Sequence, residues 1–400
     1  MSEKAGSLGI VIGVLDAPAL AVVGGNGQIE LPDARIELGW SLYTDHWHAP
    51  LTASTRQHAV EGMPVVETRV AVPSGDVVHR AYAVAGPPPS VVVDIENASP
   101  GPVAVALRVR GAGTGAAAIA ALVHAVPAWR EVEVDGDVTS LIWPLPHRAS
   151  VRAVVALSGR AGSVVDVRAM PTPDDVARGW SAQLARGARV EVDDEALQHA
   201  IDGARAALVL RASCDRPRPT VDDVIALEDW GFDDEAVAAW ERLSIRDRRR
   251  AARRAPTESA WALVRGGLAA APGGVPVEPA QFLRALREVL VTDANESGAG
   301  TTIAFFPGFP SEWLGRAVAV HDAPTRGGVV SCALRWHGSR PALLWTAPPG
   351  VTVRAPALDP NWSSDAAEGE ELLASPPDRL LRLATATREG DAVADPGSFT

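Results

Sequence analysis

The stretch Val103–Arg110 reads VAVALRVR, and every second residue in it is a large apolar one. A period of two places one row of side chains in a core and the other row toward water, which is the pattern of a half-buried β-strand. Val66–Val72 (VETRVAV) repeats this pattern, with Glu67 and Arg69 in the polar row. Both stretches are therefore predicted to be strands that cover a common apolar core.

Similar short segments follow one another from Leu8 to Arg168, without a long helical pattern between them. Turn residues separate them, for example Asp135-Gly136 between Glu131–Val134 and the apolar run that ends at Trp143. Consecutive short strands with turns of this kind are typical of antiparallel sheets that pack face to face. We therefore expect residues 1–170 to form a large antiparallel β-sandwich.

The period changes near Met170. Between Pro173 and Val291 the apolar residues recur at helical spacing, as in Leu197, Ile201 and Leu208. We expect residues 171–294 to form five or six short helices arranged as hairpins. Alternating segments return afterwards and predict a small β-module at 295–360, and the acidic, proline-rich residues 361–400 are expected to be a partly ordered tail. The fold class is therefore expected to be α+β.

Composition excludes several classes of protein. The 400 residues include 49 acidic and 37 basic side chains, a net charge of −12, which disfavours nucleic acid and anionic membranes as partners. Two distant cysteines cannot make a disulfide framework or a zinc site. The apolar run Leu8–Leu15 is shorter than the ~20 residues of a spanning helix, and no signal-peptide cleavage site follows it. We therefore expect a cytoplasmic protein.

Three segments resemble those of a known family. Pro64–Val70 with Val91–Asn97 (VVVDIEN) is similar to sandwich strands of the glucoamylase-type six-hairpin glycosidases. Leu227–Phe232 (LEDWGF) resembles one of their barrel hairpins. Ala333–Trp345 (ALRWHGSRPALLW) resembles the closing β-module of uncharacterised bacterial proteins related to that group. The resemblance implies a sandwich, an (α/α)6 barrel and a smaller β-domain, and it implies a role in carbohydrate chemistry.

The helical region is too short for a complete barrel of this family. Twelve helices of about 11 residues with connections of about 4 residues require about 180 residues, whereas Pro173 to Val291 supplies 119. We therefore expect a shortened, partial (α/α)6-like region and a protein that no longer hydrolyses glycosides but binds a carbohydrate or a protein. Two alternatives remain open: an active glycoside hydrolase-like enzyme with its pocket between sandwich and helices, and an assembly subunit that forms a homo-oligomer through the open helical face.

The segment Trp40–His48 (WSLYTDHWH) is the densest group of candidate binding residues. If it is one continuous strand, Tyr43, Asp45 and Trp47 share one face, and His46 and His48 share the other. Aromatic rings stack on sugars while carboxylates accept hydroxyl hydrogens, so the first face is a candidate carbohydrate platform. The two histidines resemble an H-x-H metal pair, but no third ligand follows, and we expect no metal site.

Two further groups are candidates. Glycoside hydrolysis needs paired carboxyl groups, and Glu228 and Asp229 are the acidic pair of the helical region. Neighbours on a helix diverge by about 100°, so only one could act, with a distant partner such as Asp322 or Glu312. Arg335 and His337 are expected to point away from the core on a strand and to bind a ligand. No P-loop or strand-linked GxGxxG is present, so no cofactor is expected.

Overall fold

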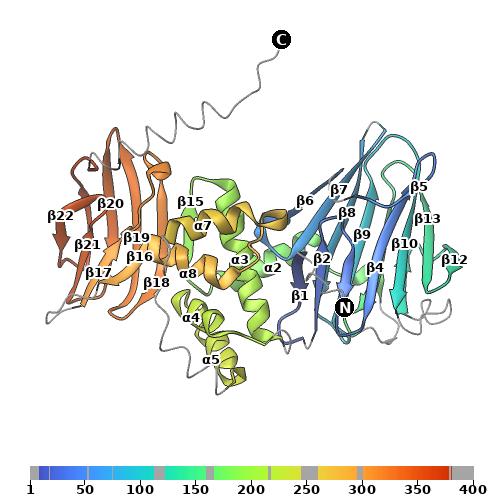
Figure 1. Ribbon diagram of the computed structural model, residues 1–400, viewed down its shortest axis with the longest axis horizontal. Helices are drawn as coiled ribbons and strands as arrows, with labels where there is room; N and C mark the ends of the chain where they lie inside the picture. The colour runs from blue at the N-terminus through green and yellow to red at the C-terminus, as the bar shows by residue number, and fades with distance from the viewer. Residues whose placement is uncertain are drawn as a thin grey trace, which may run out of the picture.

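The computed structural model describes residues 9–17, 19–51, 54–73, 75–111, 122–158, 166–214, 218–244, 260–294, 301–377 and 380. These residues form an elongated molecule in which a layer of helices lies between two β-rich units (Figure 1). The N-terminal unit contains β1 to β14, and the C-terminal unit contains β15 to β23. The α+β fold class expected from the sequence is confirmed at this level.

The N-terminal unit consists of two antiparallel sheets. Sheet A has the order β1-β2-β3-β4-β10-β13-β12, and β5 pairs with β4. Its strands are β1 (Gly9–Gly13), β2 (Leu20–Gly24), β3 (Ile29–Leu31), β4 (Ile36–Tyr43), β5 (Trp47–His48), β10 (Val103–Gly111), β12 (Glu131–Asp135) and β13 (Val138–Leu145). Sheet B has the order β11-β14-β9-β8-β7-β6. Its strands are β6 (Thr55–Ala59), β7 (Val65–Val72), β8 (Gly75–Val84), β9 (Ser90–Asn97), β11 (Val123–Val126) and β14 (Ser150–Ala156).

The alternation in Val103–Arg110 has the predicted outcome on β10. Val105, Leu107 and Val109 are buried in the core between the two sheets, whereas Arg108 and Arg110 are exposed on the opposite face. Sheet A therefore has one apolar face inside the unit and one outer face toward solvent. The expected hairpin at Asp135-Gly136 is also present, with Asp135 paired to Val138 and Gly136 at a positive φ of 60°.

Sheet B differs from the prediction because both of its faces are buried. Tyr82, Val92 and Val154 lie on its outer face and belong to a core that they share with the helices. Glu67, expected to face water, is only 6% exposed and accepts hydrogen bonds of 2.7 Å from Arg69 and Arg80. Burial opposes its ionisation, but these bonds outweigh burial and hold the pKa of Glu67 below its usual value. The polar row was misread because its ion pairs with Arg69 and Arg80 allow the Glu67 carboxylate to be buried within the sheet surface.

The helical layer contains six helices among the described residues, which agrees with the expected five or six. They are α2 (Pro173–Leu184), α3 (Glu195–Ser213), α4 (Val221–Asp229), α5 (Asp233–Arg242), α7 (Ala260–Ala269) and α8 (Pro279–Leu290). Side-chain caps fix three of the N-termini: Thr172 and Thr220 form capping boxes, and Asp194 accepts a hydrogen bond from the Leu197 amide. The short 3₁₀ turns are η2 (Val60–Gly62), η3 (Val167–Ala169), η5 (Pro272–Gly274) and η6 (Ser311–Trp313).

Helix α3 is the centre of this layer. It is 19 residues long, and its buried residues lie all around the helix rather than on one stripe. Small residues allow this close packing: a Cβ on Gly203 would lie 3.2 Å from the Gly62 carbonyl oxygen, and a Cβ on Gly62 would lie 2.6 Å from the His199 carbonyl oxygen. Gly62 also has a φ of +74°, which disfavours other residues. The turn η2, which connects β6 and β7 of sheet B, and α3 therefore meet at nearly backbone-to-backbone distance.

The C-terminal unit also has two sheets. One has the order β15-β18-β19-β20-β23 and contains β15 (Arg189–Val192), β18 (Val318–Thr325), β19 (Gly328–His337), β20 (Arg340–Thr346) and β23 (Glu368–Leu372). The other has the order β16-β17-β21-β22 and contains β16 (Val291–Ala294), β17 (Thr301–Phe305), β21 (Val351–Ala355) and β22 (Asp359–Ser364), with β17 and β21 parallel.

The boundaries of this unit are wider than the expected 295–360. It recruits β15 from the helical region, begins with β16 at Val291, and extends through β23 to Leu372. The first part of the segment expected as a tail therefore forms two strands, and residues 381–400 lie outside the described residues. Among the described helices, none is long and apolar enough to cross a membrane.

The two sheets of the N-terminal unit meet at an aromatic pair. The ring of Trp40 from sheet A stacks on the ring of His79 from sheet B, with centroids 4.8 Å apart. The Trp40 Nε1–H donates to the Asn26 carbonyl oxygen at 2.9 Å. His79 is 1% exposed, and burial lowers its pKa to about 4 from the model-peptide value of 6.5. The interior therefore holds His79 in the neutral form.

This burial predicts a defined pH dependence of stability. Because the folded pKa of His79 is below the unfolded one, the unfolded chain binds a proton first as the pH falls. Stability is then lost between pH 6.5 and about 4, by on the order of 3 kcal/mol in total. Urea unfolding at pH 7 and at pH 4 measures this loss. Between these two pH values, the free energy of unfolding of H79F is expected to fall by about 3 kcal/mol less than that of the wild type. H337F, at an exposed histidine, is the control, and equal losses for wild type and H79F would contradict the assignment.

Candidate functional site

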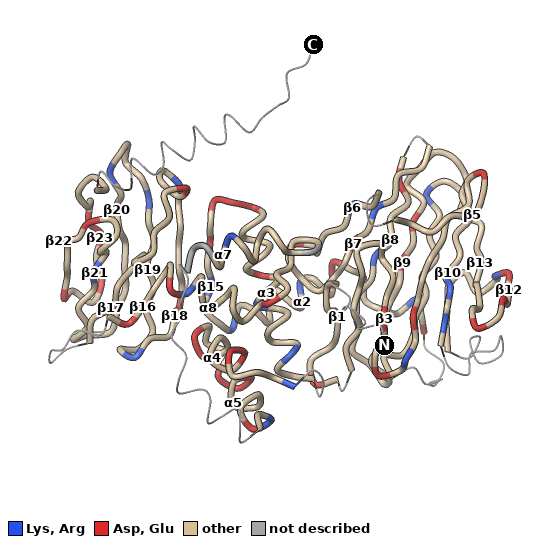
Figure 2. Tube along the Cα trace, viewed as in Figure 1, with Lys and Arg blue, Asp and Glu red and all other residues tan. Residues whose placement is uncertain are grey.

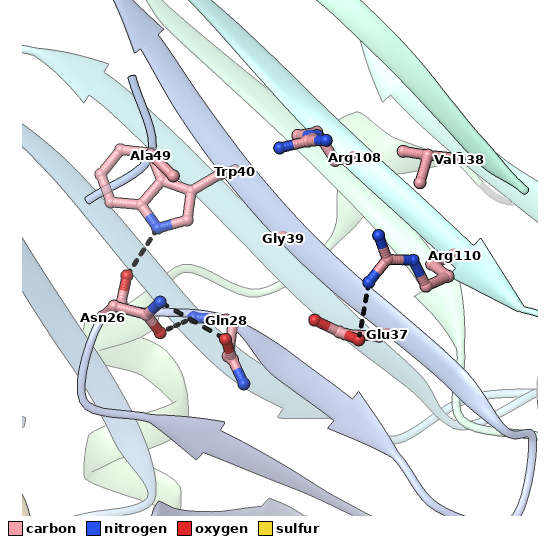
Figure 3. Close-up of a pocket in the computed structure, with 9 residues that line it drawn as sticks. All are labelled: Asn26, Gln28, Glu37, Gly39, Trp40, Ala49, Arg108, Arg110 and Val138. Atoms are coloured by element: carbon pink, nitrogen blue, oxygen red, sulfur yellow. Dashed lines mark hydrogen bonds and ion pairs between the residues drawn. The ribbon is translucent and has the colours of Figure 1, made fainter. Parts of the chain in front are cut away.

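A groove lies on the outer face of sheet A. Its floor is formed by β4, β10 and β13 and is lined by small residues at Gly39, Ser41, Ala106 and Ser140. Two adjoining hollows of about 500 and 140 Å³ share Ala49, Arg108 and Val138 as lining residues. Figure 3 shows the smaller hollow, with Gly39 between Trp40 and the two arginines. The groove exists because glycine, serine and alanine occupy positions at which longer side chains would fill this face.

Arg108 stands at the centre of the groove. The register places it opposite Gly39 on β4 and Ser140 on β13, and Glu133 of β12 is opposite Ser140. Its neighbour Arg110 approaches Glu37 at 3.8 Å and Asp137 at 3.6 Å. Arg108 itself has no hydrogen bond or ion pair with the described residues. Of the two arginines in Figure 3, Arg110 is the one joined by a dashed line, to Glu37. Its guanidinium donors are therefore free to bind a ligand.

An aromatic pair forms one rim of the groove. The Tyr43 and Trp47 rings lie 5.4 Å apart at an angle of 59° and are 41% and 43% exposed. They share a face as predicted, but the expected continuous strand Trp40–His48 is wrong. The chain turns at Thr44–His46, and β5 folds back so that Trp47 pairs with Tyr43 in the register. Trp47 and His48 line the larger hollow.

The other predicted residues of this segment lie in or beside the turn. Asp45 and His46 are exposed, and the His46 and His48 rings are 5.5 Å apart. His48 Nδ1 lies 3.3 Å from the His46 carbonyl oxygen. No cluster of three or more His, Cys, Asp or Glu side chains able to hold a metal occurs in the described part of the chain. The structure thus brings together all five candidate residues between Tyr43 and His48.

Arg335 and His337 lie elsewhere. Both are exposed on β19 of the C-terminal unit, on the side opposite Trp336, as the strand pattern predicts. Trp336 packs against the core and donates its Nε1–H to the Arg316 carbonyl oxygen. Figure 1 shows β19 and β5 in opposite end units of the molecule. The candidate ligand residues therefore do not form one site.

Glu228 and Asp229 end α4, also away from the groove. The Glu228 side chain is largely exposed. Partial burial of its carboxyl group, together with the nearby charges of Asp229 and Asp233, raises its pKa. Asp229 is half-buried and lines a separate cavity of about 210 Å³ with Arg284, Arg287, Asp293 and Arg326. Burial raises the pKa of Asp229, although Arg287 and Arg284 oppose this effect.

The expected distant partners of this acidic pair do not line that cavity. Glu312 lies 3.7 Å from Arg265, and Asp322 lies 4.0 Å from Arg189. Two other carboxyl groups share the cavity with Asp229: Glu288 of α8 and Asp293 of β16. The pairing with Asp293 could not be expected from the sequence, because β16 follows α8 and reaches α4 only through tertiary packing.

The groove residues that were not singled out from the sequence include Arg108, Glu133 and Ser140. The alternation of β10 placed Arg108 on an outer face, but the order β4-β10-β13-β12 joins segments far apart in the chain. The signal that could have indicated the groove is Gly39 in the middle of strand β4, since glycine inside a strand often marks close approach of a ligand.

No protein-family model and no curated protein matches this chain.

The raised pKa of Asp229 predicts the effect of removing its charge. A carboxyl group whose folded pKa exceeds the unfolded one destabilises the fold at high pH and has no effect below both values. D229N is therefore expected to increase the free energy of unfolding at pH 7, and the gain should disappear as the pH falls below 4. D222N, which loses the ion pair to Arg284, is the control and should be less stable than the wild type at pH 7. Destabilisation by D229N at pH 7 would contradict this account.

Proposed function

We propose that the protein binds a carbohydrate in the groove on the outer face of sheet A. The observation that carries this proposal is the half-exposed Trp47 beside a hollow lined by Arg108, whose guanidinium group has no partner among the described residues. An aromatic face and a few convergent polar groups are the usual combination for holding a sugar ring. The floor of small residues leaves room for one or two rings between them.

Each lining group has a distinct role in this proposal. The Trp47 ring stacks on the apolar face of a sugar, and Arg108 donates hydrogen bonds to hydroxyl or carboxylate oxygens. Glu133 and Ser140 line the same hollow and accept or donate hydrogen bonds on its far side. The described part of the groove is open to solvent. An open groove of this kind suits the end or a branch of an oligosaccharide rather than a fully enclosed substrate.

The proposed function includes a relationship to the six-hairpin glycosidases. The two facing N-terminal sheets would correspond to their sandwich, and the six described helices would correspond to about half of their barrel. In this proposal, the protein retains sugar binding on the sheet and has lost the ring of helices that encloses a substrate during hydrolysis.

Hydrolysis remains a second candidate function because of one specific observation. Asp229, with its raised pKa, shares a cavity with Asp293, and two carboxyl groups with different environments are what acid–base hydrolysis needs. Release of nitrophenol from a panel of nitrophenyl glycosides, abolished in D229N and D293N, would support this candidate. The assembly hypothesis lacks such support, since Val237 and Trp240 of α5 are the large apolar side chains that the described helices expose.

Substitution of Trp47 tests the carbohydrate proposal. In a glycan-array screen followed by titration calorimetry, W47A is expected to weaken binding of the best ligand about tenfold, equivalent to about 1.4 kcal/mol. W240A removes a similarly exposed tryptophan from α5 and should leave binding unchanged.

A second pair of variants separates the two arginines of the groove. R108Q is expected to weaken the same ligand more than R110Q, because Arg110 is already engaged by Glu37 and Asp137. Absence of glycan binding by the wild type, or equal affinities for wild type and W47A, would contradict the proposal.

A further inference from the structure

Strand β12 leaves one edge of sheet A open. It pairs with β13 on one side and is the last strand of the sheet in the described part of the chain. All five of its residues are exposed, and Val132 and Val134 are 43% and 52% exposed. An edge strand presents unpaired backbone N–H and C=O groups and is normally shortened, covered, or protected by charged side chains or Pro. β12 has no Pro, and its three charged side chains are all acidic, so they disfavour pairing with an acidic strand but not with a basic one.

The side chains of β12 alternate strictly between acidic and apolar. Glu131, Glu133 and Asp135 face the groove side, opposite Ile142, Ser140 and Val138 of β13. Val132 and Val134 face the other side, opposite the buried Leu141 and Thr139. None of the three carboxylates has an ion pair or hydrogen bond with a described residue. Figure 2 shows the acidic colour along β12 at the end of the molecule.

This pattern selects among the strands that could pair with the edge. A second copy of β12 would place acidic side chains across from acidic side chains, which destabilises a sheet. A strand with Arg or Lys at alternate positions would place a cation opposite each carboxylate, while its apolar residues would cover Val132 and Val134. The charge of the edge therefore favours a basic partner strand.

We propose that β12 is a docking edge for an extended protein segment in which basic and apolar residues alternate. The segment adds one antiparallel or parallel strand to sheet A through backbone hydrogen bonds, and the acidic row sets its register. This surface adjoins the sugar groove, because Glu133 lines the groove and also belongs to the acidic row of β12. The partner lies along the edge of the sheet and does not require Trp47.

The probe is the acetylated and amidated peptide Arg-Val-Arg-Val-Arg-Val-Arg, titrated against the full chain by fluorescence anisotropy at 50 and 300 mM salt. Binding is expected at low salt and should weaken at high salt, because exposed ion pairs are screened. Two peptides serve as controls: one of the same composition with the arginines and valines in separate blocks, and one with glutamate in place of arginine. Both should bind at least tenfold more weakly.

N-methylation separates strand addition from attraction between charges. Alternate residues of an added strand direct their N–H groups toward β12. Methylation of this set of peptide nitrogens should therefore abolish binding, and methylation of the other set should leave binding unchanged.

Substitution in the acidic row tests its role. E133R is expected to weaken binding of the unmodified peptide at least tenfold. E370R, on the acidic but non-alternating edge strand β23, is the matched control and should have no effect. Equal binding of the block peptide, equal effects of the two methylated peptides, or no binding at all would overturn the proposal. W47A should bind this peptide normally, which keeps the outcome independent of the carbohydrate proposal.

Discussion

The burial of sheet B under helices α2 and α3 is the constraint on which the rest of the molecule depends. One apolar core runs from the outer face of sheet B through the helices to the C-terminal unit, and a second core fills the space between sheets A and B. The contact of Gly62 with the backbone of α3 requires glycine in both conformation and size. Arg205, buried within α3, donates to Asp202 and to the Leu184 carbonyl oxygen through its two Nη atoms and lies near the Trp230 and Phe232 rings, so the layer stabilises most of its buried cation, although Nε has no partner among the described residues.

This arrangement determines where a ligand can bind in the N-terminal unit. Much of the outer face of sheet B lies against the helical core, and charged residues there form structural pairs, as Asp94 does with Arg152 and the Tyr82 hydroxyl. Sheet A keeps an outer face on which small residues form a groove and Arg108 has no described partner. Its far edge, β12, carries an acidic row without counter-ions among the described residues. The two proposals therefore concern the face and the edge of the same sheet, and both follow from its position away from the helices.

Local sequence patterns predicted the strands, helices and turns well, but they predicted poorly which of these elements lie next to one another. The alternation in Val103–Arg110, the helical spacing of Leu197, Ile201 and Leu208, and the hairpin at Asp135-Gly136 all depend on nearby residues, and the structure agrees with each. Glu67 was misplaced because its burial depends on hydrogen bonds from Arg69 on its own strand and from Arg80 on the neighbouring strand β8. The cluster Tyr43–His48 was found because its members are contiguous, whereas Arg108 and Glu133 join it only through long-range strand pairing. Asp229 and Asp293 meet for the same reason.

Hydrogen–deuterium exchange of the full chain, with and without the oligosaccharide that binds most tightly in a glycan screen, tests the central claim most directly. The account predicts slower exchange in peptides that cover β4, β5, β10 and β13, and unchanged exchange in α4, α8 and the C-terminal sheets. Protection centred on Asp229 and Asp293, or on β19 and β20, would contradict it and would place the ligand site outside the outer face of sheet A.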